Sequence, residues 1–158
     1  MNFLIMLFLM IGAVIVVGLP IALLNEWALQ QQEAYRKQVQ SIADGGTAVT
    51  PEQFFKIRES YKGHLHDFDF MGCYVIHNLT KNMFYVGQAT HVPQRVNNHF
   101  TGKGNGDVYA DYKYGNQFEI RLVNIMDTEY SRLDDLERDL INAFDAYDHG
   151  YNKTRGNK

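Results

Sequence analysis

The chain has 158 residues, a formal net charge of -3 and a single cysteine, Cys73. This length suits one compact domain, and one cysteine excludes an internal disulfide scaffold. The net negative charge excludes a uniformly basic protein, so any surface that binds nucleic acid has to be local. With 10 Tyr and 10 Phe residues, the chain has enough large side chains to build a core.

The first 25 residues contain no Asp, Glu, Lys or Arg, and residues 3–24 are almost wholly apolar. About 20 apolar residues in a helix cross the core of a bilayer. The pattern therefore predicts a transmembrane helix over residues 1–25, with residues 3–24 in contact with lipid. A cleaved signal peptide is one alternative, but no basic residue precedes the run and no A-x-A pattern follows it. A buried core helix is the other alternative, for which the run is long.

A polar segment follows, and it is free of Pro and Gly up to Ala43. It predicts a helical stalk or linker over residues 26–49 rather than a core element. Arg36 and Lys37 lie after the apolar run, whereas no basic residue lies before it. By the positive-inside rule, the protein is expected to span the membrane once with its C-terminal domain in the cytoplasm.

Residues 50–158 mix strand and helix patterns, which predicts an α+β domain with a small three-stranded antiparallel sheet flanked by helices. Thr50 and Gln53 have the spacing of a capping box at a helix start. Residues 63–70 predict a solvated loop, because their His and Asp residues match no metal-binding spacing. The predicted helices cover residues 51–61, 93–100, 108–114 and 129–147. The predicted strands cover residues 72–78, 83–88 and 118–124.

The first two strands predict a β-hairpin with a four-residue loop. This loop places Tyr74 opposite Gly87 and Ile76 opposite Tyr85, all on one face of the sheet. Tyr74 and Tyr85 become diagonal neighbours, and Gly87 leaves the backbone open to a ligand. Taken alone, the hairpin favours a plain interpretation, in which both tyrosines are core aromatics.

The predicted helices 93–100 and 129–147 carry further candidate residues for a functional site. Arg95 and His99 are four residues apart and share a helix face, where Arg suits phosphate oxygens and His moves protons near neutral pH. Alone, such a pair usually marks a solvated face. Glu137 falls within the apolar stripe of helix 129–147, where a lone carboxylate costs on the order of several kcal/mol unless a cation compensates. That cation is either a bound divalent metal or an arginine in a structural salt bridge, and the sequence favours neither of the two.

In order and spacing, these residues resemble the GIY-YIG nuclease family. Ten residues separate two signature triplets, and Asn152 lies fifteen residues after Glu137. The resemblance covers roughly residues 70–153, and Cys73 and Val86 depart from the family's usual Ile. The matching positions are Gly72-Cys73-Tyr74, Tyr85-Val86-Gly87, Arg95 and His99 as the Arg-x-x-x-His helix, Glu137 as the metal-binding glutamate, and Asn152 as the C-terminal asparagine.

The resemblance implies an endonuclease that hydrolyses DNA with Mg²⁺ or Mn²⁺ held by Glu137. Tyr74 would be the general base for the attacking water, with help from His99. Arg95 would stabilise charge on the phosphate, and Tyr85 would orient the water or the phosphate. The alternative is a membrane-anchored module of the same fold that binds nucleic acid without cutting it.

DNA contacts are expected through backbone phosphates, with low sequence specificity. Asn152 would support either the C-terminal segment or the phosphate, and either Tyr109 or Tyr112 is a candidate to join the site. The choice between DNA and RNA, the biological process and homo-oligomerisation stay open, although DNA crossing the cell envelope fits a membrane-tethered nuclease. The expected substrate-binding residues are Gly87, Lys103, Asn152 and Lys153.

Overall fold

The computed structural model describes residues 3–46 and 48–156, without the side chains of residues 3–20. The chain divides into two compact units, Met1–Lys37 and Gln38–Lys158. Helix α1 (Phe3–Asp44) contributes to both units.

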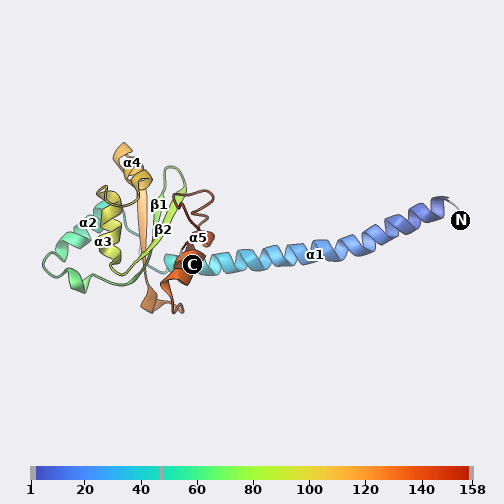
Figure 1. Ribbon diagram of the computed structural model, residues 1–158, viewed down its shortest axis with the longest axis horizontal. Helices are drawn as coiled ribbons and strands as arrows, with labels where there is room; N and C mark the ends of the chain where they lie inside the picture. The colour runs from blue at the N-terminus through green and yellow to red at the C-terminus, as the bar shows by residue number, and fades with distance from the viewer. Residues whose placement is uncertain (1–2, 47, 157–158) are drawn as a thin grey trace. The chain divides into compact units, whose positions relative to one another are not determined.

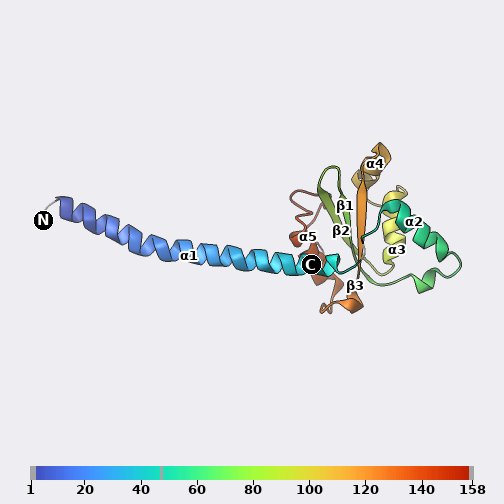
Figure 2. The ribbon, with the colours of Figure 1, turned by 180° about the vertical axis from the view of Figure 1, so that it is seen from behind.

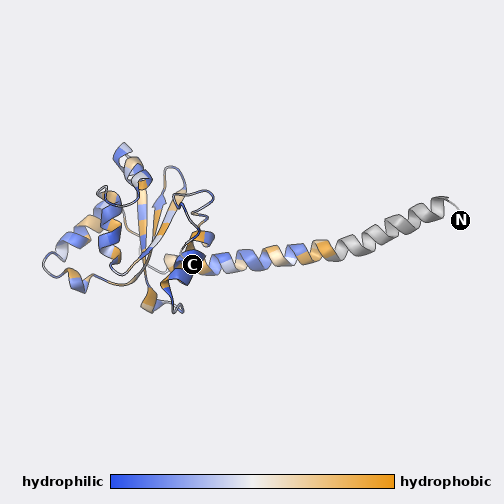
Figure 3. Ribbon diagram, viewed as in Figure 1, coloured by the Kyte–Doolittle hydropathy of each residue, from blue (hydrophilic) through white to orange (hydrophobic). Residues whose placement is uncertain are grey.

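In the first unit, the described part of α1 is exposed from residue 21 to residue 37. Its apolar stretch from Ile21 to Leu24 is followed by a mostly polar segment (Figure 3). The predicted transmembrane segment, residues 3–24, falls mainly on residues 3–20, whose side chains lie outside the described part. Among the residues that are described, no helix combines the length and the apolar character needed to cross a membrane.

The second unit is built on a three-stranded antiparallel sheet with strand order β2-β1-β3. Tyr74 pairs with Gly87 and Ile76 pairs with Tyr85, so the predicted register is confirmed. β1 lies in the centre, and all but one of its residues are buried, as expected for a strand covered on both faces. The strands are β1 (Gly72–Asn78), β2 (Met83–Ala89) and β3 (Phe118–Asn124).

The sheet is antiparallel and is flanked by helices, so the predicted α+β class is confirmed. Figures 1 and 2 show α2 and α3 on one face and α5 on the other. The predicted capping box is present, because Thr50 Oγ1 accepts from the Gln53 backbone N–H and Gln53 Oε1 accepts from the Thr50 N–H. The elements are α2 (Pro51–Ser60), α3 (Val92–Phe100), α4 (Gly106–Tyr114), α5 (Leu133–Ala143) and two 3₁₀ turns, η1 (Leu65–Asp67) and η2 (Ile125–Asp127).

The alternation of side chains along β1 divides the core into two clusters. Tyr74 and Ile76 pack on the face covered by α2, α3 and α4. Cys73 and Val75 pack on the opposite face, together with α5. The tyrosine that carries the candidate chemistry is therefore part of one hydrophobic core, and α5 belongs to the other.

The last turns of α1 belong to the core of the second unit, which differs from the stalk expected over residues 26–49. Val39 is 2 % exposed and Ala43 is fully buried. Both lie in the cluster that includes α5, and Gln40 Nε2 donates to the backbone carbonyl of Ala143 at 2.7 Å. Val39 and Ala43 are four residues apart and so share one helix face. Two apolar residues are too few to give a recognisable pattern in a polar segment, so the sequence did not predict this packing.

α5 spans only Leu133–Ala143, whereas the expected helix ran from residue 129 to residue 147. It ends in a Schellman motif: the Ala146 N–H donates to the Ile141 carbonyl at 3.0 Å, and the Asp145 N–H donates to the Asn142 carbonyl at 3.3 Å. Asp145 takes the left-handed conformation, with φ of 53°. Because Asp stands where Gly is usual, the sequence gives no clear stop signal.

Candidate active site

Tyr74 and Tyr85 lie on the same face of the hairpin, as expected. Tyr74 is 1 % exposed and Tyr85 is half-buried, with 6.2 Å between their ring centroids. The Tyr74 hydroxyl lies over Gly87, where an added Cβ would be 2.3 Å from the hydroxyl oxygen. A glycine is therefore required opposite Tyr74, because any side chain there would displace the hydroxyl.

α3 brings His99 and Arg95 to the two tyrosines. Pro93 in its first turn suits the start of a helix, and the buried residues Val92 and Val96 hold it against the sheet. His99 is fully buried, and its Nε2 lies 2.9 Å from the Tyr74 hydroxyl oxygen. The other ring nitrogen, Nδ1, accepts a hydrogen bond from the backbone N–H of Asn105 at 2.8 Å.

Burial is the largest influence on the pKa values of Tyr74, Tyr85 and His99. It raises the pKa of Tyr74 and of Tyr85, although the positive charge of Arg95 acts against the rise at both hydroxyls. Burial, together with the charge of Arg95, lowers the pKa of His99 to about 4. The imidazole is therefore neutral at pH 7. Burial alone would lower the pKa of Arg95, but the two tyrosines outweigh this effect and raise it, so Arg95 stays charged.

Glu137 reaches the hairpin from the opposite face of the sheet. Its side chain is held by Gln88, which directly follows Gly87: Gln88 Nε2 donates to Glu137 Oε2 at 3.0 Å and to Asp134 Oδ1 at 2.7 Å. After burial, the charge of Glu137 also contributes to raising the pKa of Tyr85. Glu137 is 9 % exposed, so it is a buried carboxylate, as its place in the apolar stripe predicted.

The donor set around Glu137 fits a hard divalent cation. Asp134 adds a second carboxylate one helical turn away, and Mg²⁺ typically binds one or two carboxylates while water and phosphate oxygens complete its octahedral shell. Within the described residues, no group of three or more His, Cys, Asp or Glu side chains could hold a metal ion by itself.

Asn152 supports the edge of the hairpin. Its Oδ1 accepts from the Val86 backbone N–H at 2.9 Å, and its Nδ2 donates to the Val86 carbonyl at 2.8 Å. The neighbouring Tyr151 N–H donates to the Phe84 carbonyl at 2.8 Å. Both polar atoms of the Asn152 side chain are therefore engaged with β2, which favours the first of its two expected roles, support of the C-terminal segment.

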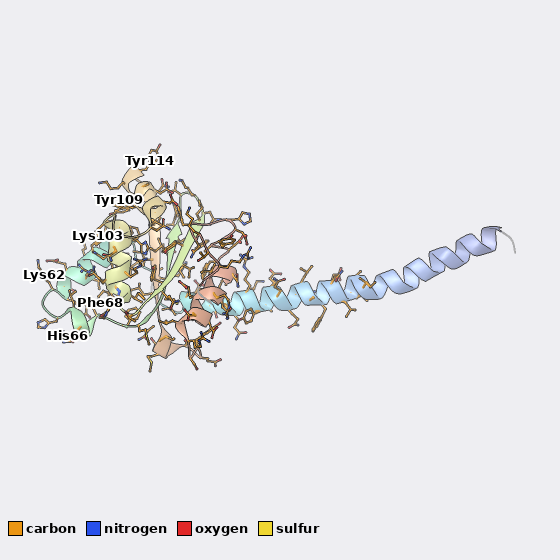
Figure 4. All side chains as sticks on the ribbon, in the orientation of Figure 1. Lys62, His66, Phe68, Lys103, Tyr109 and Tyr114 are labelled. Atoms are coloured by element: carbon orange, nitrogen blue, oxygen red, sulfur yellow. The ribbon has the colours of Figure 1, made fainter. Side chains whose placement is uncertain are left out.

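The two expected lysines lie on the surface. Figure 4 labels Lys103, which is exposed in the turn after α3. Lys153 Nζ forms an exposed ion pair with Asp107 at 2.7 Å. An exposed pair of this kind contributes little to stability, so the lysine can exchange its partner for a phosphate oxygen.

The two candidate tyrosines of α4 differ in position. Tyr112 packs into the core, with its ring centroid 5.1 Å from that of Phe100. Tyr109 lies over Gly102, where an added Cβ would be 3.1 Å from its ring, and the exposed Lys103 follows Gly102 in the sequence. Of the two, Tyr109 is therefore the one placed beside an expected phosphate contact.

Sequence reasoning missed Gln88, Asp134 and Asn105 as members of this group. Gln88 follows the second triplet directly, and Asp134 is one turn before Glu137 on the same helix face. Asn105 caps α4 through hydrogen bonds from the backbone N–H groups of Asp107 and Val108. An N-cap signal was therefore present in the sequence, but the contact of the Asn105 backbone with His99 was not.

The family model for the GIY-YIG catalytic domain matches residues 70–152, more than half of the chain. The matched segment contains all three strands, α3, α4 and α5. A search of curated proteins and a search of solved structures each found no match.

Proposed function

Since this chain belongs to the GIY-YIG family of nuclease domains, we propose that it is a metal-dependent endonuclease that hydrolyses DNA phosphodiester bonds. The observation that carries the proposal is the group formed by Tyr74, Tyr85, Arg95 and His99, together with the buried carboxylate of Glu137, which Gln88 of the same hairpin holds. A buried phenol beside a charged guanidinium and a neutral imidazole is a costly arrangement for a fold, and it is common at catalytic sites.

Arg95 is the substrate-binding cation of the proposal. Arg95 is exposed, and its positive charge favours a lower pKa at both tyrosine hydroxyls. A phosphate bound by its planar guanidinium would lie close to those hydroxyls, and Arg95 would stabilise the negative charge that develops in the transition state. Lys103 and Lys153 would contact neighbouring backbone phosphates.

Tyr74 is the proposed general base. Tyr74 would first lose its hydroxyl proton to solvent. A water molecule then attacks the phosphorus atom, the Tyr74 phenolate takes a proton from that water, and the bond from phosphorus to the 3′-oxygen breaks, so that this oxygen leaves as an alkoxide that takes up a proton from solvent. Because burial raises the pKa of Tyr74, the phenolate needs stabilisation, and Arg95 and the hydrogen bond from His99 would supply it. Tyr85 would orient the water or the phosphate.

Glu137 would hold one Mg²⁺ or Mn²⁺, with Asp134 as a further carboxylate at the same place. When bound, this cation supplies charge stabilisation at the scissile phosphate and at the leaving 3′-oxygen. The amide of Gln88 would keep the two carboxylates in position before the cation binds.

Membrane anchoring is the second part of the proposal. Residues 1–25 carry no charged side chain, and five large apolar side chains between residues 21 and 29 of α1 are exposed. These residues are Ile21, Leu23, Leu24, Trp27 and Leu29. A single span with the domain in the cytoplasm would place the nuclease where DNA enters across the envelope, which suits defence against phage or plasmids, superinfection exclusion or processing during uptake.

Cleavage of a supercoiled plasmid by the full chain in detergent tests the catalytic part. Mg²⁺ or Mn²⁺ should give nicked or linear product, and EDTA should stop the reaction. Glu137→Ala should abolish cleavage while circular dichroism shows a folded domain, whereas Glu129→Ala, at an exposed carboxylate before α5, should cleave like the wild type. Metal-independent cutting, or full activity in Glu137→Ala, contradicts the proposal. Binding of DNA without cleavage would identify the catalytically silent module instead.

A further inference from the structure

The turn between α3 and α4 lies directly against the ring of His99. The backbone N–H of Asn105 donates to His99 Nδ1 at 2.8 Å. A Cβ added to Gly104 would lie 2.6 Å from His99 Nδ1 and 2.8 Å from His99 Cα. Only glycine allows the turn to pass this close, so the approach of the turn to the ring depends on residue 104.

This contact fixes the position of the imidazole proton. A ring nitrogen that accepts a hydrogen bond carries no hydrogen, so the neutral ring of His99 bears its proton on Nε2. Nε2 lies 2.9 Å from the Tyr74 hydroxyl oxygen. In that contact His99 is therefore the donor, and the Tyr74 oxygen is the acceptor.

The Tyr74 proton is then directed elsewhere. Tyr85 is the neighbouring hydroxyl on this face, with its ring centroid 6.2 Å from that of Tyr74. The hydrogen bonds around His99 then run in one direction, from the Asn105 backbone through the ring to the Tyr74 oxygen. The half-buried Tyr85 is nearer to solvent than the buried Tyr74.

The opposite arrangement is disfavoured by geometry. A proton on Nδ1 would face the Asn105 N–H, so two donors would meet in a buried place and neither would have an acceptor. A base that removes the Tyr74 proton through Nε2 would need that arrangement. The turn itself is held in place, because Asn105 Oδ1 accepts from the first turn of α4 and Asn105 Nδ2 donates to the Tyr151 carbonyl at 3.3 Å.

We propose that Gly104 and Asn105 form a positioning element that holds His99 in the Nε2–H tautomer, so that His99 donates a hydrogen bond to Tyr74 and does not remove its proton. The catalytic consequence rests on the proposed nuclease function: a donor at Nε2 stabilises the Tyr74 phenolate that accepts the proton of the attacking water. Gly104 and Asn105 act through His99 and touch no reacting atom.

Nitrogen NMR of the full chain in detergent, with ¹⁵N-labelled histidine, tests the tautomer directly. At pH 7 the signals of His99, assigned by their loss in His99→Gln, should show a protonated Nε2 and an unprotonated Nδ1. Gly104→Ala should change this pattern, because the added methyl group displaces the ring or the turn. Gly106→Ala is the matched control, since an added Cβ there meets no atom within 4 Å. A proton on Nδ1 in the wild type, or an unchanged spectrum in Gly104→Ala, overturns the proposal.

Two substitutions of His99 test the consequence for cleavage. The amide nitrogen of glutamine can occupy the place of Nε2 and donate to Tyr74, whereas that of asparagine reaches only the place of Nδ1. His99→Gln should keep activity within about tenfold and keep the pH profile of the wild type, while His99→Asn should lose about a hundredfold. Equal losses in both variants overturn the donor role. If the wild type does not cleave, the proposed function fails, but the NMR result still decides the tautomer.

Discussion

The side chain of Asn152 pairs with both backbone groups of Val86, the middle residue of the second triplet. The outer side of an edge strand leaves its N–H and C=O groups without a neighbouring strand. Asn152 supplies one donor and one acceptor in their place, as a neighbouring strand would. The C-terminal segment therefore holds the strand that carries Tyr85 and Gly87.

Asn152→Asp should weaken this support. A carboxylate still accepts from the Val86 N–H, but it cannot donate to the Val86 carbonyl and it brings a negative charge close to that oxygen. We expect a loss of about 1–3 kcal/mol in the free energy of unfolding, measured with urea, together with a lower rate of cleavage. Asn142→Asp is the control, since Asn142 is exposed on α5. Equal stability of the two variants would contradict the support role.

The hairpin could be predicted because its register depends on local patterns. The alternation of side chains and the length of the loop were enough to place Tyr74 opposite Gly87. Glu137 was predicted as a buried carboxylate for a similar reason, since the apolar stripe of α5 surrounds it.

The contacts that orient the candidate site were not predictable, because they join groups that are far apart in the sequence. Asn152 binds Val86 across 66 positions, and Gln88 binds Glu137 across 49 positions. No periodic pattern encodes such contacts. The end of α5 was missed for a different reason. Asp145 adopts the left-handed conformation that glycine usually adopts at the end of a helix, so no glycine marks the end in the sequence.

Stability should depend on the protonation of His99. The pKa of His99 is about 4 in the folded protein, whereas an ordinary histidine, as in the unfolded chain, has a pKa of 6.5. The unfolded chain therefore binds a proton at His99 more readily than the folded protein does. The contribution of the neutral ring is therefore present above pH 6.5 and is lost as the pH falls toward 4, by an amount on the order of 3 kcal/mol. Urea unfolding at pH 7 and at pH 5 should show about 2 kcal/mol of this loss in the wild type but a smaller loss in His99→Gln.

His66→Gln is the control for this pH dependence. The His66 side chain is 78 % exposed, so its removal should leave the slope of stability against pH unchanged. The same slope in the wild type and in His99→Gln would mean that His99 titrates normally in the folded protein.

Arg95→Lys should impair cleavage although it keeps the positive charge. Lysine offers a point charge on a flexible stem, whereas the guanidinium can hold two phosphate oxygens in a fixed plane. We expect a loss of about tenfold to a hundredfold in kcat, and a larger loss in Arg95→Ala. Arg58→Lys is the control, because Arg58 only donates to Gln94 on the exposed side of α3. Wild-type kcat in Arg95→Lys would refute the proposed role of Arg95.

The C-terminal turns of α1 should stabilise the domain. A fragment of residues 38–158 retains the buried side chains of Val39 and Ala43, whereas a fragment of residues 50–158 leaves their place in the core open to water. The shorter fragment should be less stable by roughly 3 kcal/mol in urea unfolding. In the full chain, Val39→Ala should be destabilising and Leu29→Ala, at a position 64 % exposed, should be neutral. Equal stability of the two fragments would show that the α1 contacts contribute nothing.

The full chain should fractionate with membranes and resist extraction by high salt and by carbonate. Salt screens charge contacts only, whereas an apolar run of this length is held by the hydrophobic effect, so detergent should be needed for release. The fragment of residues 38–158, which lacks the run, should stay in the supernatant. Arginine at both Val14 and Val16 should weaken membrane association, since each charge costs about 2.5–3.5 kcal/mol at the centre of a span.

The orientation of the domain decides which DNA the proposed nuclease meets. Arg36 and Lys37 follow the apolar run, so a reporter fused after Lys158 should be active in the cytoplasm and resist protease added to sealed cells. Magnesium and incoming DNA would both be available to the domain there. Release of the full chain by carbonate would refute the anchor, and protease sensitivity in sealed cells would place the domain outside, where it would cut DNA before or during uptake.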